Sequence, residues 1–332
     1  MVRLGTVGSG WIVKSFLGGT KYVDGLTLAA VYSRSGERAQ QFASETGAPA
    51  YFTDLRQMAQ SNEIDAVYIA SPNSLHVEQS RLFLEHGKHV ICEKTVAPTR
   101  AQTEELVCLA RRQGLVFLEA IVTMHLPALA LLERAVKEIA PVRLARFDIS
   151  QYSSKYPAYL RGELPNIFNP QFCTGSLMDM GVYCVYPAIR LFGRPKAIQA
   201  SASFLESGAD AAGSAIFEYD GFGAVITHCK AGTTKLGSEI IGERGTITID
   251  SISTLQGMTL HHPDGRKEAL AGEDTREHIM SFEARSFYEA IGDPARNREK
   301  VEELCALACE VSGAMETIRR QAGIRFPSDI QD

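Results

Sequence analysis

The chain has 332 residues, of which 45% are hydrophobic and 22% charged, and its formal net charge is -5. At about 100–200 residues per domain, this length predicts two domains, and the composition excludes a disordered, collagen-like or coiled-coil protein. The charge balance offers no basic face for nucleic acid or a membrane surface, and no apolar run approaches the ~20 residues that span a bilayer. The first residues show no leader pattern, so we expect a soluble, cytoplasmic protein.

The seven cysteines are scattered along the chain without a Cys-x-x-Cys pair. The nearest two, Cys305 and Cys309, have the i, i+4 spacing of a helix. We therefore expect buried thiols, with no disulfide framework and no metal site.

Residues 1–120 alternate short apolar runs with amphipathic segments. Strands are expected at 2–7, 26–32, 65–70, 88–92 and 115–118, and helices at 11–22, 36–46, 75–86 and 100–113. Strands that are apolar throughout and alternate with helices are typical of a parallel sheet covered on both faces. The prediction is a doubly wound α/β domain over residues 1–120.

Residues 121–332 follow a different pattern. Helices are expected at 126–139, 175–192, 276–291 and 300–321, strands at 143–151 and through most of 197–270, and an irregular, proline-containing segment at 152–174. This predicts a second, α+β domain with a large, open, mostly antiparallel sheet. Because the free face of such a sheet needs a cover and no third domain is available, we expect a homodimer or a dimer of dimers.

A Gly-Ser-Gly motif at 8–10 follows the first predicted strand and opens the first predicted helix. In a dinucleotide-binding turn, the first glycine permits the tight bend, and the second lets the backbone approach a pyrophosphate at the helix N-terminus. Val13 stands where that fingerprint has its third small residue, and a plain glycine turn is the alternative interpretation. The candidate cofactor contacts of this segment are Gly8, Gly10, Trp11 and Ile12.

Ser33 and Arg34 follow the second predicted strand, where an NAD-binding domain usually has an acid for the ribose 2′-hydroxyl. The permanent charge of Arg34, with Arg38 about one turn later, suits a 2′-phosphate instead. We therefore expect NADP as the cofactor, with NAD as the alternative. A solvated surface charge is the other interpretation of Arg34.

Ser71 and Asn73 follow the third predicted strand, and His76 lies on the next helix. The carboxyl ends of parallel strands line the ligand crevice of an open α/β sheet, so all three are candidate cofactor contacts. Helix capping by Ser71 and a buried structural role for His76 are the alternatives.

Glu93 and Lys94 directly follow the fourth predicted strand. A lysine at the carboxyl end of a central strand can donate to a carbonyl or alkoxide oxygen and stabilise its charge. Glu93 could hold the lysine in place, although such a pair is also common on protein surfaces.

Asp179 and Tyr183 are four residues apart in the segment 175–192, so a helix places them on one face. Gly175 and Gly181 are poor helix formers, which indicates that helix propensity did not select this segment. An acid and a phenol on one face can meet a substrate hydroxyl; an exposed aspartate beside a half-buried tyrosine is the alternative.

These motifs occur in the order and spacing of one family. Together with the segment 87–94 and the closing residues 323–327, they make the chain resemble the glucose–fructose oxidoreductase, inositol dehydrogenase and MocA (Gfo/Idh/MocA) family essentially from end to end. The spacing of Asp179, Gly181 and Tyr183 resembles the branch that contains dimeric dihydrodiol dehydrogenase. The family's Glu-Lys-Pro is replaced here, because Thr95 follows Lys94.

The resemblance implies an N-terminal Rossmann domain, a C-terminal domain with an open sheet, and substrate bound between them beside the nicotinamide. Lys94, Asp179 and Tyr183 match the family's catalytic positions. The resemblance also gives three candidate substrate contacts, which are His125, Asn166 and Phe168.

The expected function is an NADP-dependent oxidoreductase that interconverts a secondary alcohol and a ketone on a sugar, polyol or cyclic diol. Tyr183 would exchange the hydroxyl proton, Lys94 would stabilise the oxygen and Asp179 would orient both, with His125 as the alternative proton acceptor. Two other functions remain open. One is a non-catalytic NADP-binding sensor, and the other is an epimerase- or glycosidase-like enzyme whose cofactor is reduced and reoxidised within one cycle.

Overall fold

The chain forms two compact units. The computed structural model describes residues 1–271 and 274–330. The first unit combines Met1–Ile121 with Thr275–Cys309, and the second combines Val122–Asp274 with the chain after Cys309. The units are therefore not consecutive stretches of sequence, because a C-terminal segment joins the N-terminal one.

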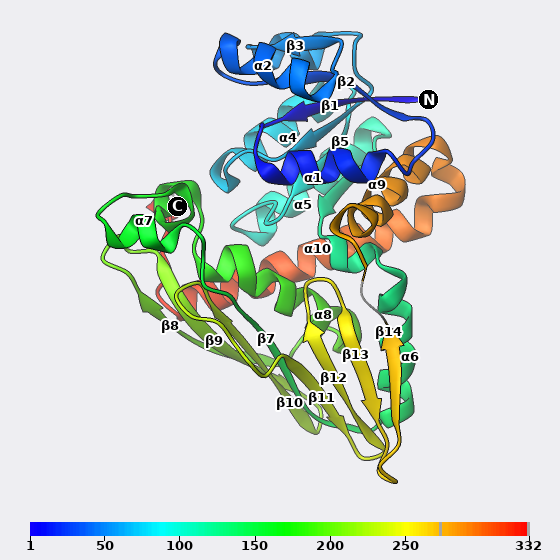
Figure 1. Ribbon diagram of the computed structural model, residues 1–332, viewed down its shortest axis with the longest axis vertical. Coiled ribbons are helices and arrows are strands. Elements are labelled where there is room, and N and C mark those ends of the chain that lie inside the picture. The colour runs from blue at the N-terminus through cyan, green and yellow to red at the C-terminus, as the bar shows by residue number, and fades with distance from the viewer. Residues whose placement is uncertain (272–273, 331–332) are drawn as a thin grey trace. The chain divides into compact units, whose positions relative to one another are not determined.

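The first unit is built on a six-stranded parallel sheet with the strand order β3-β2-β1-β4-β5-β6 (Figure 1). The strands are β1 (Val2–Val7), β2 (Leu26–Tyr32), β3 (Ala50–Phe52), β4 (Ala66–Ile69), β5 (His89–Glu93) and β6 (Phe117–Ala120). The helices are α1 (Trp11–Thr20), α2 (Gly36–Thr46), α3 (Leu55–Gln60), α4 (His76–Glu85), α5 (Arg100–Gln113), α9 (Arg276–Gly292) and the first part of α10 (Pro294–Gln321). This confirms the predicted doubly wound fold, and the strand order reverses direction between β1 and β4.

Local sequence explains why these segments form this sheet. All four residues of β4 are buried, as a parallel strand covered on both faces requires. The side chains of Ser35 and Thr99 cap the N-termini of α2 and α5, and both helices end at a left-handed glycine, Gly47 and Gly114.

Helix α9 packs on α1 within the first unit. A Cβ on Gly19 would lie 2.7 Å from the Met280 carbonyl carbon, so glycine is needed for the helices to approach this closely. Arg285 donates a hydrogen bond of 2.6 Å to the carbonyl oxygen of Tyr22, across a sequence separation of 263 residues. This contact fixes the C-terminal segment on the Rossmann unit.

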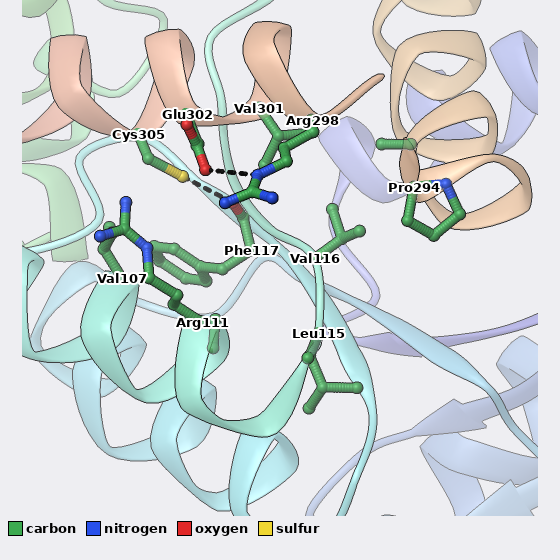
Figure 2. Close-up of a pocket in the computed structure, with 13 residues that line it drawn as sticks. Val107, Arg111, Leu115, Val116, Phe117, Pro294, Arg298, Val301, Glu302 and Cys305 are labelled. Carbon is green, nitrogen blue, oxygen red and sulfur yellow. Dashed lines mark hydrogen bonds and ion pairs between the residues drawn. The ribbon is translucent and has the colours of Figure 1, made fainter. Parts of the chain in front are cut away.

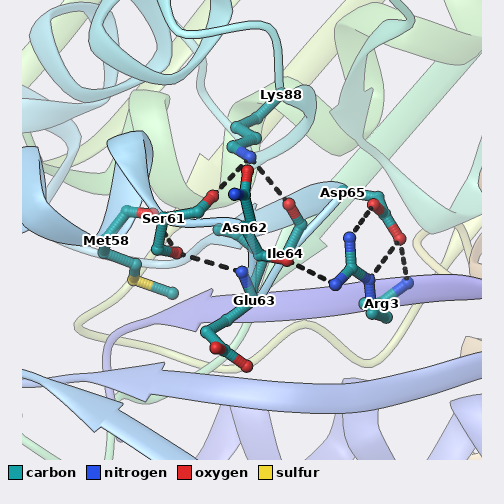
Figure 3. Close-up of polar contacts among 8 residues, drawn as sticks. All are labelled: Arg3, Met58, Ser61, Asn62, Glu63, Ile64, Asp65 and Lys88. Carbon is teal, nitrogen blue, oxygen red and sulfur yellow. Dashed lines mark hydrogen bonds and ion pairs between the residues drawn. The ribbon is translucent and has the colours of Figure 1, made fainter.

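Polar contacts close the amino-terminal ends of β1, β4 and β5 (Figure 3). The Arg3 guanidinium pairs with the Asp65 carboxylate at 2.6 Å and holds the pKa of that carboxyl below its ordinary value. The Lys88 ammonium donates to the carbonyl oxygens of Ser61 and Ile64, at 2.7 and 2.9 Å. The charged groups at these amino-terminal ends are therefore paired within the unit. The candidate ligand residues lie at the other, carboxyl ends of the strands.

The second unit contains an eight-stranded sheet with the order β14-β13-β12-β11-β7-β10-β9-β8 (Figure 1). The strands are β7 (Val142–Ser150), β8 (Ala197–Phe204), β9 (Asp210–Tyr219), β10 (Phe222–Cys229), β11 (Ser238–Gly242), β12 (Gly245–Ser251), β13 (Gln256–His261) and β14 (Lys267–Ala271). Neighbouring strands are antiparallel except β7 and β10, so the predicted mostly antiparallel sheet is confirmed. No helix in the described part of the chain is long and apolar enough to cross a membrane.

Alternate residues of the central strands form the core of this unit. Phe147 on β7, Phe217 on β9 and Ile226 on β10 are fully buried. Two helices, α6 (Pro127–Ile139) and α8 (Val182–Phe192), pack on this face. The alternation is that of an antiparallel sheet with one face on a core.

The segment 175–192 differs from the single helix that we expected. Leu177–Gly181 forms a π-helical turn, and α8 begins directly after it at Val182. The segment 152–174, expected to be irregular, contains α7 (Tyr156–Leu160) and two 3-10 turns, Asn166–Phe168 and Pro170–Phe172. Single π turns inside helices are rare and occur frequently at functional sites.

The other face of the sheet carries β-branched side chains. Ile216 on β9 is 50% exposed, and it pairs across the ladder with the half-buried Val225 on β10. Half-exposed apolar side chains on a broad sheet favour association with a second surface of the same kind.

We predict that the protein is a homodimer, or a dimer of dimers, joined through this face, because burying apolar surface contributes about 25 cal/mol per Å². Light scattering at micromolar concentration should give two or four times the chain mass of 36.3 kDa. Ile216→Lys should shift the mass toward the monomer. Tyr51→Lys, which changes an exposed side chain on β3 of the first unit, is the matched control and should leave the dimer intact. A monomeric unmodified protein contradicts the prediction.

Candidate functional site

The glycine motif lies between β1 and α1, as predicted. Gly8 has a φ of +112°, and a Cβ on it would lie 2.7 Å from the carbonyl oxygen of Ala70. A glycine is therefore required for the carboxyl ends of β1 and β4 to lie this close. Gly10 is the N-cap of α1, and a Cβ there would meet no described atom within 4 Å. The turn thus presents open backbone at a helix N-terminus, which suits a phosphate.

Trp11 and Ile12 open α1 directly after this turn. Trp11 is 69% exposed, and the Arg276 guanidinium of α9 lies 5.2 Å from the centre of its ring. A cation at this distance over an indole face is attracted to it. The proximity of Arg276 to Trp11 could not be predicted from the sequence, since it depends on how α9 packs on α1.

Arg38 connects α2 to the glycine turn. Its Nε donates a hydrogen bond of 2.8 Å to the hydroxyl of Ser9, in the middle of the motif. Ser33 and Arg34 lie between β2 and the Ser35 cap of α2, and Arg34 is exposed. The guanidinium of Arg38 is therefore fixed beside the glycine turn, and Arg34 lies close to it in the sequence. The donors of this segment fit the phosphates of a dinucleotide.

The loop that carries Lys94 is held by several side chains. His76 is fully buried, with Nδ1 3.0 Å from the Thr95 carbonyl oxygen and Nε2 2.8 Å from the Ser71 carbonyl oxygen. The Asn73 amide donates to the Thr95 hydroxyl at 3.3 Å. Burial lowers the pKa of His76, while its hydrogen bonds to the Thr95 and Ser71 carbonyl groups act in the opposite direction. His76 thus joins the loops after β4 and β5.

Two further contacts complete this loop. The backbone N–H of Val96 donates to the buried Glu119 carboxylate of β6 at 2.9 Å, and the hydroxyl of Ser71 donates to Gln79 at 2.7 Å. The Lys94–Thr95 peptide bond is cis. Although Thr95 replaces the family's proline, its carbonyl and hydroxyl groups are both bonded, and Lys94 itself is half-buried.

Glu93 lies at the end of β5 and is buried. It accepts a hydrogen bond from the Tyr68 hydroxyl, and Tyr68 stacks on Phe16 with ring centres 4.0 Å apart. Burial raises the pKa of Glu93, while the charge of Lys94 acts in the opposite direction. Burial also raises the pKa of Glu283 on α9, and the Glu93 carboxylate raises it further. The two carboxyls therefore do not both ionise readily.

Asp179 and Tyr183 stand out by exposure in the second unit. Within residues 174–189, all of which the structure describes, every residue is buried except these two. Asp179 lies in the π turn and Tyr183 in the first turn of α8. Both positions break the buried run, and that they share one face stays a prediction.

A buried network holds the π turn. The Asp210 carboxylate of β9 accepts a hydrogen bond of 2.6 Å from the Leu177 backbone N–H, and the His228 ring of β10 lies 2.9 Å from the Ser176 hydroxyl. Burial raises the pKa of Asp210 to about 6 and lowers that of His228 to about 3. Gly175 has a φ of +146°, and a Cβ on it would lie 1.9 Å from Asp210 Oδ1. Glycine at this position is therefore what lets Asp210 reach the turn.

Lys230, directly after β10, is the partner of Asp179 in this unit. Its side chain is 6% exposed, and its ammonium donates to the Asp179 carboxylate. Lys230 was not predicted from the sequence, because its pairing with Asp179 depends on how β10 packs under the turn.

The predicted substrate contacts lie in the second unit. His125 ends the 3-10 turn Val122–His125. Asn166 is exposed, while Phe168 is fully buried and packs edge-on against Tyr156, with ring centres 5.6 Å apart. Phe168 therefore helps to order the segment 152–174, and a role in contacting substrate stays a prediction for all three residues.

A pocket of about 140 Å³ lies in the first unit between α5 and α10 (Figure 2). Apolar side chains line most of it, and Arg298 on α10 pairs with Glu302 at 3.0 Å. Cys305 donates to the Phe117 carbonyl oxygen at 3.3 Å. None of the candidate cofactor residues lines this pocket.

None of the seven cysteines, all of which lie in the described part of the chain, forms a disulfide. Burial raises the pKa of Cys92 and Cys184 well above the ordinary thiol value. Within residues 1–271 and 274–330, no three His, Cys, Asp or Glu side chains lie together as a metal site.

Comparisons with known proteins agree with this geometry. A family model described as "Oxidoreductase family, NAD-binding Rossmann fold" matches residues 2–120, and one described as "GFO/IDH/MocA C-terminal domain" matches residues 135–248. The chain is 42% identical over 329 residues to scyllo-inositol 2-dehydrogenase (NADP(+)) IolU of Bacillus subtilis, which covers 99% of each protein. It is 28% identical over 228 residues to trans-1,2-dihydrobenzene-1,2-diol dehydrogenase of Danio rerio, covering 67% of this chain and 66% of that protein.

A solved structure has the same fold. KijD10, a 3-ketoreductase from Actinomadura kijaniata in complex with NADP and TDP-benzene, superposes with a TM-score of 0.84 at 21% identity. The match covers 96% of this chain and 97% of that chain.

The cofactor residues of the first unit predict a preference for NADP(H) over NAD(H) of about 10- to 150-fold, the size of one charge-assisted contact. Arg34→Asp should erase or reverse it. Affinity can be read from the quenching of Trp11 emission, since Trp11 is the only tryptophan and follows Gly10 directly.

Arg112→Asp, which changes an exposed arginine in the last turn of α5, is the matched control for charge and should keep the preference. Equal affinity of the unmodified protein for both cofactors would count against a role for Arg34.

Proposed function

The chain belongs to the Gfo/Idh/MocA oxidoreductase family, and from this premise we propose that it is an NADP-dependent dehydrogenase. It interconverts a secondary alcohol and a ketone on a sugar, polyol or cyclic diol. The observation that carries the proposal is the pair of half-buried groups, Asp179 and Tyr183, in the otherwise buried segment 174–189. A half-exposed acid and phenol at a rare π turn are placed for contact with a polar ligand.

NADP, when bound, supplies a nicotinamide that accepts the hydride from the alcohol carbon. Gly8, Gly10 and Arg38 would hold its phosphates at the N-terminus of α1, and Arg34 would supply the positive charge for the 2′-phosphate. The fit rests on the open backbone at Gly10 and on the hydrogen bond from Arg38 to Ser9.

The chain's own residues handle the proton and the oxygen. Tyr183 takes the hydroxyl proton as the carbon–hydrogen bond breaks, so the alcohol loses one hydride and one proton and becomes a ketone. Lys94 donates to the oxygen while negative charge develops on it. Asp179 orients the reacting hydroxyl. The firmly bonded loop around Lys94 supports this role, because oriented donors act without reorganising.

The relatives give the substrate panel. The name of the Bacillus subtilis relative gives an inositol, that of the Danio rerio relative a cyclic dihydrodiol, and the KijD10 description a keto group. We therefore propose a cyclic, polyhydroxylated substrate, with scyllo-inositol as the first compound to test.

The experiment is a panel of inositols, aldoses and dihydrodiols assayed with NADP. A dehydrogenase gives a lasting rise in absorbance at the NADPH band with at least one member of the panel. An enzyme that reduces and reoxidises its cofactor within one cycle converts substrate without that rise, and a sensor does neither; either result would overturn the proposal.

Lys94→Met should lower turnover by roughly two to three orders of magnitude, the loss seen on removing one oxyanion donor. Affinity for NADPH, measured by Trp11 emission, should remain, because the glycine turn is untouched. Lys14→Met, on the exposed side of α1, is the matched lysine control. Near-normal turnover of Lys94→Met would show that the lysine is not part of the catalytic machinery.

A further inference from the structure

Lys230 holds Asp179 from the strand side of the second unit, and we propose that it is a positioning residue for catalysis. Its ammonium donates to Oδ2 of Asp179, and the residue is 5% exposed. The inference rests on the proposed function, in which Asp179 orients the reacting hydroxyl.

The backbone of Lys230 is fixed on two sides. Its N–H donates to the carbonyl oxygen of Ala211 on β9 at 2.8 Å, and its own carbonyl oxygen accepts from the N–H of Ser153 at 2.9 Å. Lys230 therefore continues the β9–β10 ladder beyond the last residue of β10. The ammonium reaches Asp179 from the end of an interior strand of the sheet, which positions groups better than a loop does.

β10 contacts the π turn at two points. His228 and Lys230 are two residues apart on an extended strand, so their side chains lie on one face. His228 meets Ser176, and Lys230 meets Asp179, which is three residues further along the turn. Residues three apart on a helical turn are neighbours on its surface. The strand thus fixes both the start of the turn and its functional side chain.

The burial of the Lys230 side chain supports a role in positioning Asp179. Removing an ammonium from water is costly, and a well-packed apolar residue of similar volume is often neutral or better for stability. The chain nevertheless has a buried lysine here, paired with the half-buried carboxylate of Asp179, which orients the reacting hydroxyl in the proposed function. Holding one carboxylate oxygen removes rotamer freedom from Asp179, and pre-organisation of this kind lowers the barrier of the chemical step.

The test is a double-mutant cycle on turnover with the best substrate of the panel, using Lys230→Met, Asp179→Asn and the double variant. Lys230→Met should lower kcat by about 10- to 150-fold, the contribution of one charge-assisted hydrogen bond, with NADPH affinity unchanged. The double variant should match Asp179→Asn alone, because Lys230 acts only through Asp179. Lys235→Met, an exposed lysine after the same strand, is the matched control and should keep full kcat.

Two results would overturn the proposal. An unchanged kcat in Lys230→Met denies any role for the lysine. A double variant slower than Asp179→Asn by the full Lys230→Met factor denies that Lys230 acts through Asp179, and weakened NADPH binding in that variant would mark the lysine as merely structural. If Lys230→Met does not fold, Lys230→Gln keeps a donor without the charge and is read in the same way.

A readout without substrate separates this proposal from the proposed function. Urea unfolding of the same four proteins should show non-additive midpoints, because the two side chains contact each other. Additive midpoints would overturn the pairing. If the unmodified protein gives no NADP-linked turnover with any compound, the proposed function fails, while the unfolding cycle still decides whether Lys230 holds Asp179.

Discussion

The absence of a Cβ at Gly8 and at Gly175 is the constraint on which the candidate residues of both units depend. A side chain at Gly8 would press on the Ala70 carbonyl oxygen at 2.7 Å and separate the carboxyl ends of β1 and β4. At Gly175 it would overlap Asp210 Oδ1 at 1.9 Å and remove the carboxylate from the Leu177 N–H. Both glycines also have a positive φ, which other residues adopt only with strain. Each functional segment therefore begins at a glycine that cannot be replaced without moving it.

The sequence predicts the Rossmann unit well because its signals are local. The apolar run of β4, the Ser35 and Thr99 caps and the glycine after β1 each report on a few neighbouring residues. The carboxyl-end rule then places Lys94 correctly, since parallel strands have one ligand edge. The short strand β3 was missed, because its three residues carry too little periodicity.

In the second unit, the π turn and the Asp179–Lys230 pair could not be predicted from local sequence. Helix spacing placed Asp179 and Tyr183 on one face, but the π turn depends on contacts with β9 and β10, which lie 33 to 52 residues further along the chain. Propensity cannot reveal a turn that Asp210 and His228 hold from another element. Lys230 was missed for the same reason, since its pairing with Asp179 is set by how the sheet packs under the turn.

Burial shifts the pKa values of His228 and Asp210, the two titratable side chains that hold the start of the π turn. Burial lowers the pKa of His228 from 6.5 to about 3 and raises that of Asp210 from 3.8 to about 6. The His228 shift favours the folded state above about pH 6.5 and loses that stability as pH falls toward 3. The Asp210 shift favours the folded state below about pH 4 and loses that stability as pH rises toward 6, so the two effects oppose each other between these limits.

Near neutral pH, His228 is an uncharged partner for the Ser176 hydroxyl, and Asp210 is a carboxylate that accepts from a backbone N–H. The positive charge next to the π turn comes from Lys230, directly after β10, which pairs with the half-buried carboxylate of Asp179.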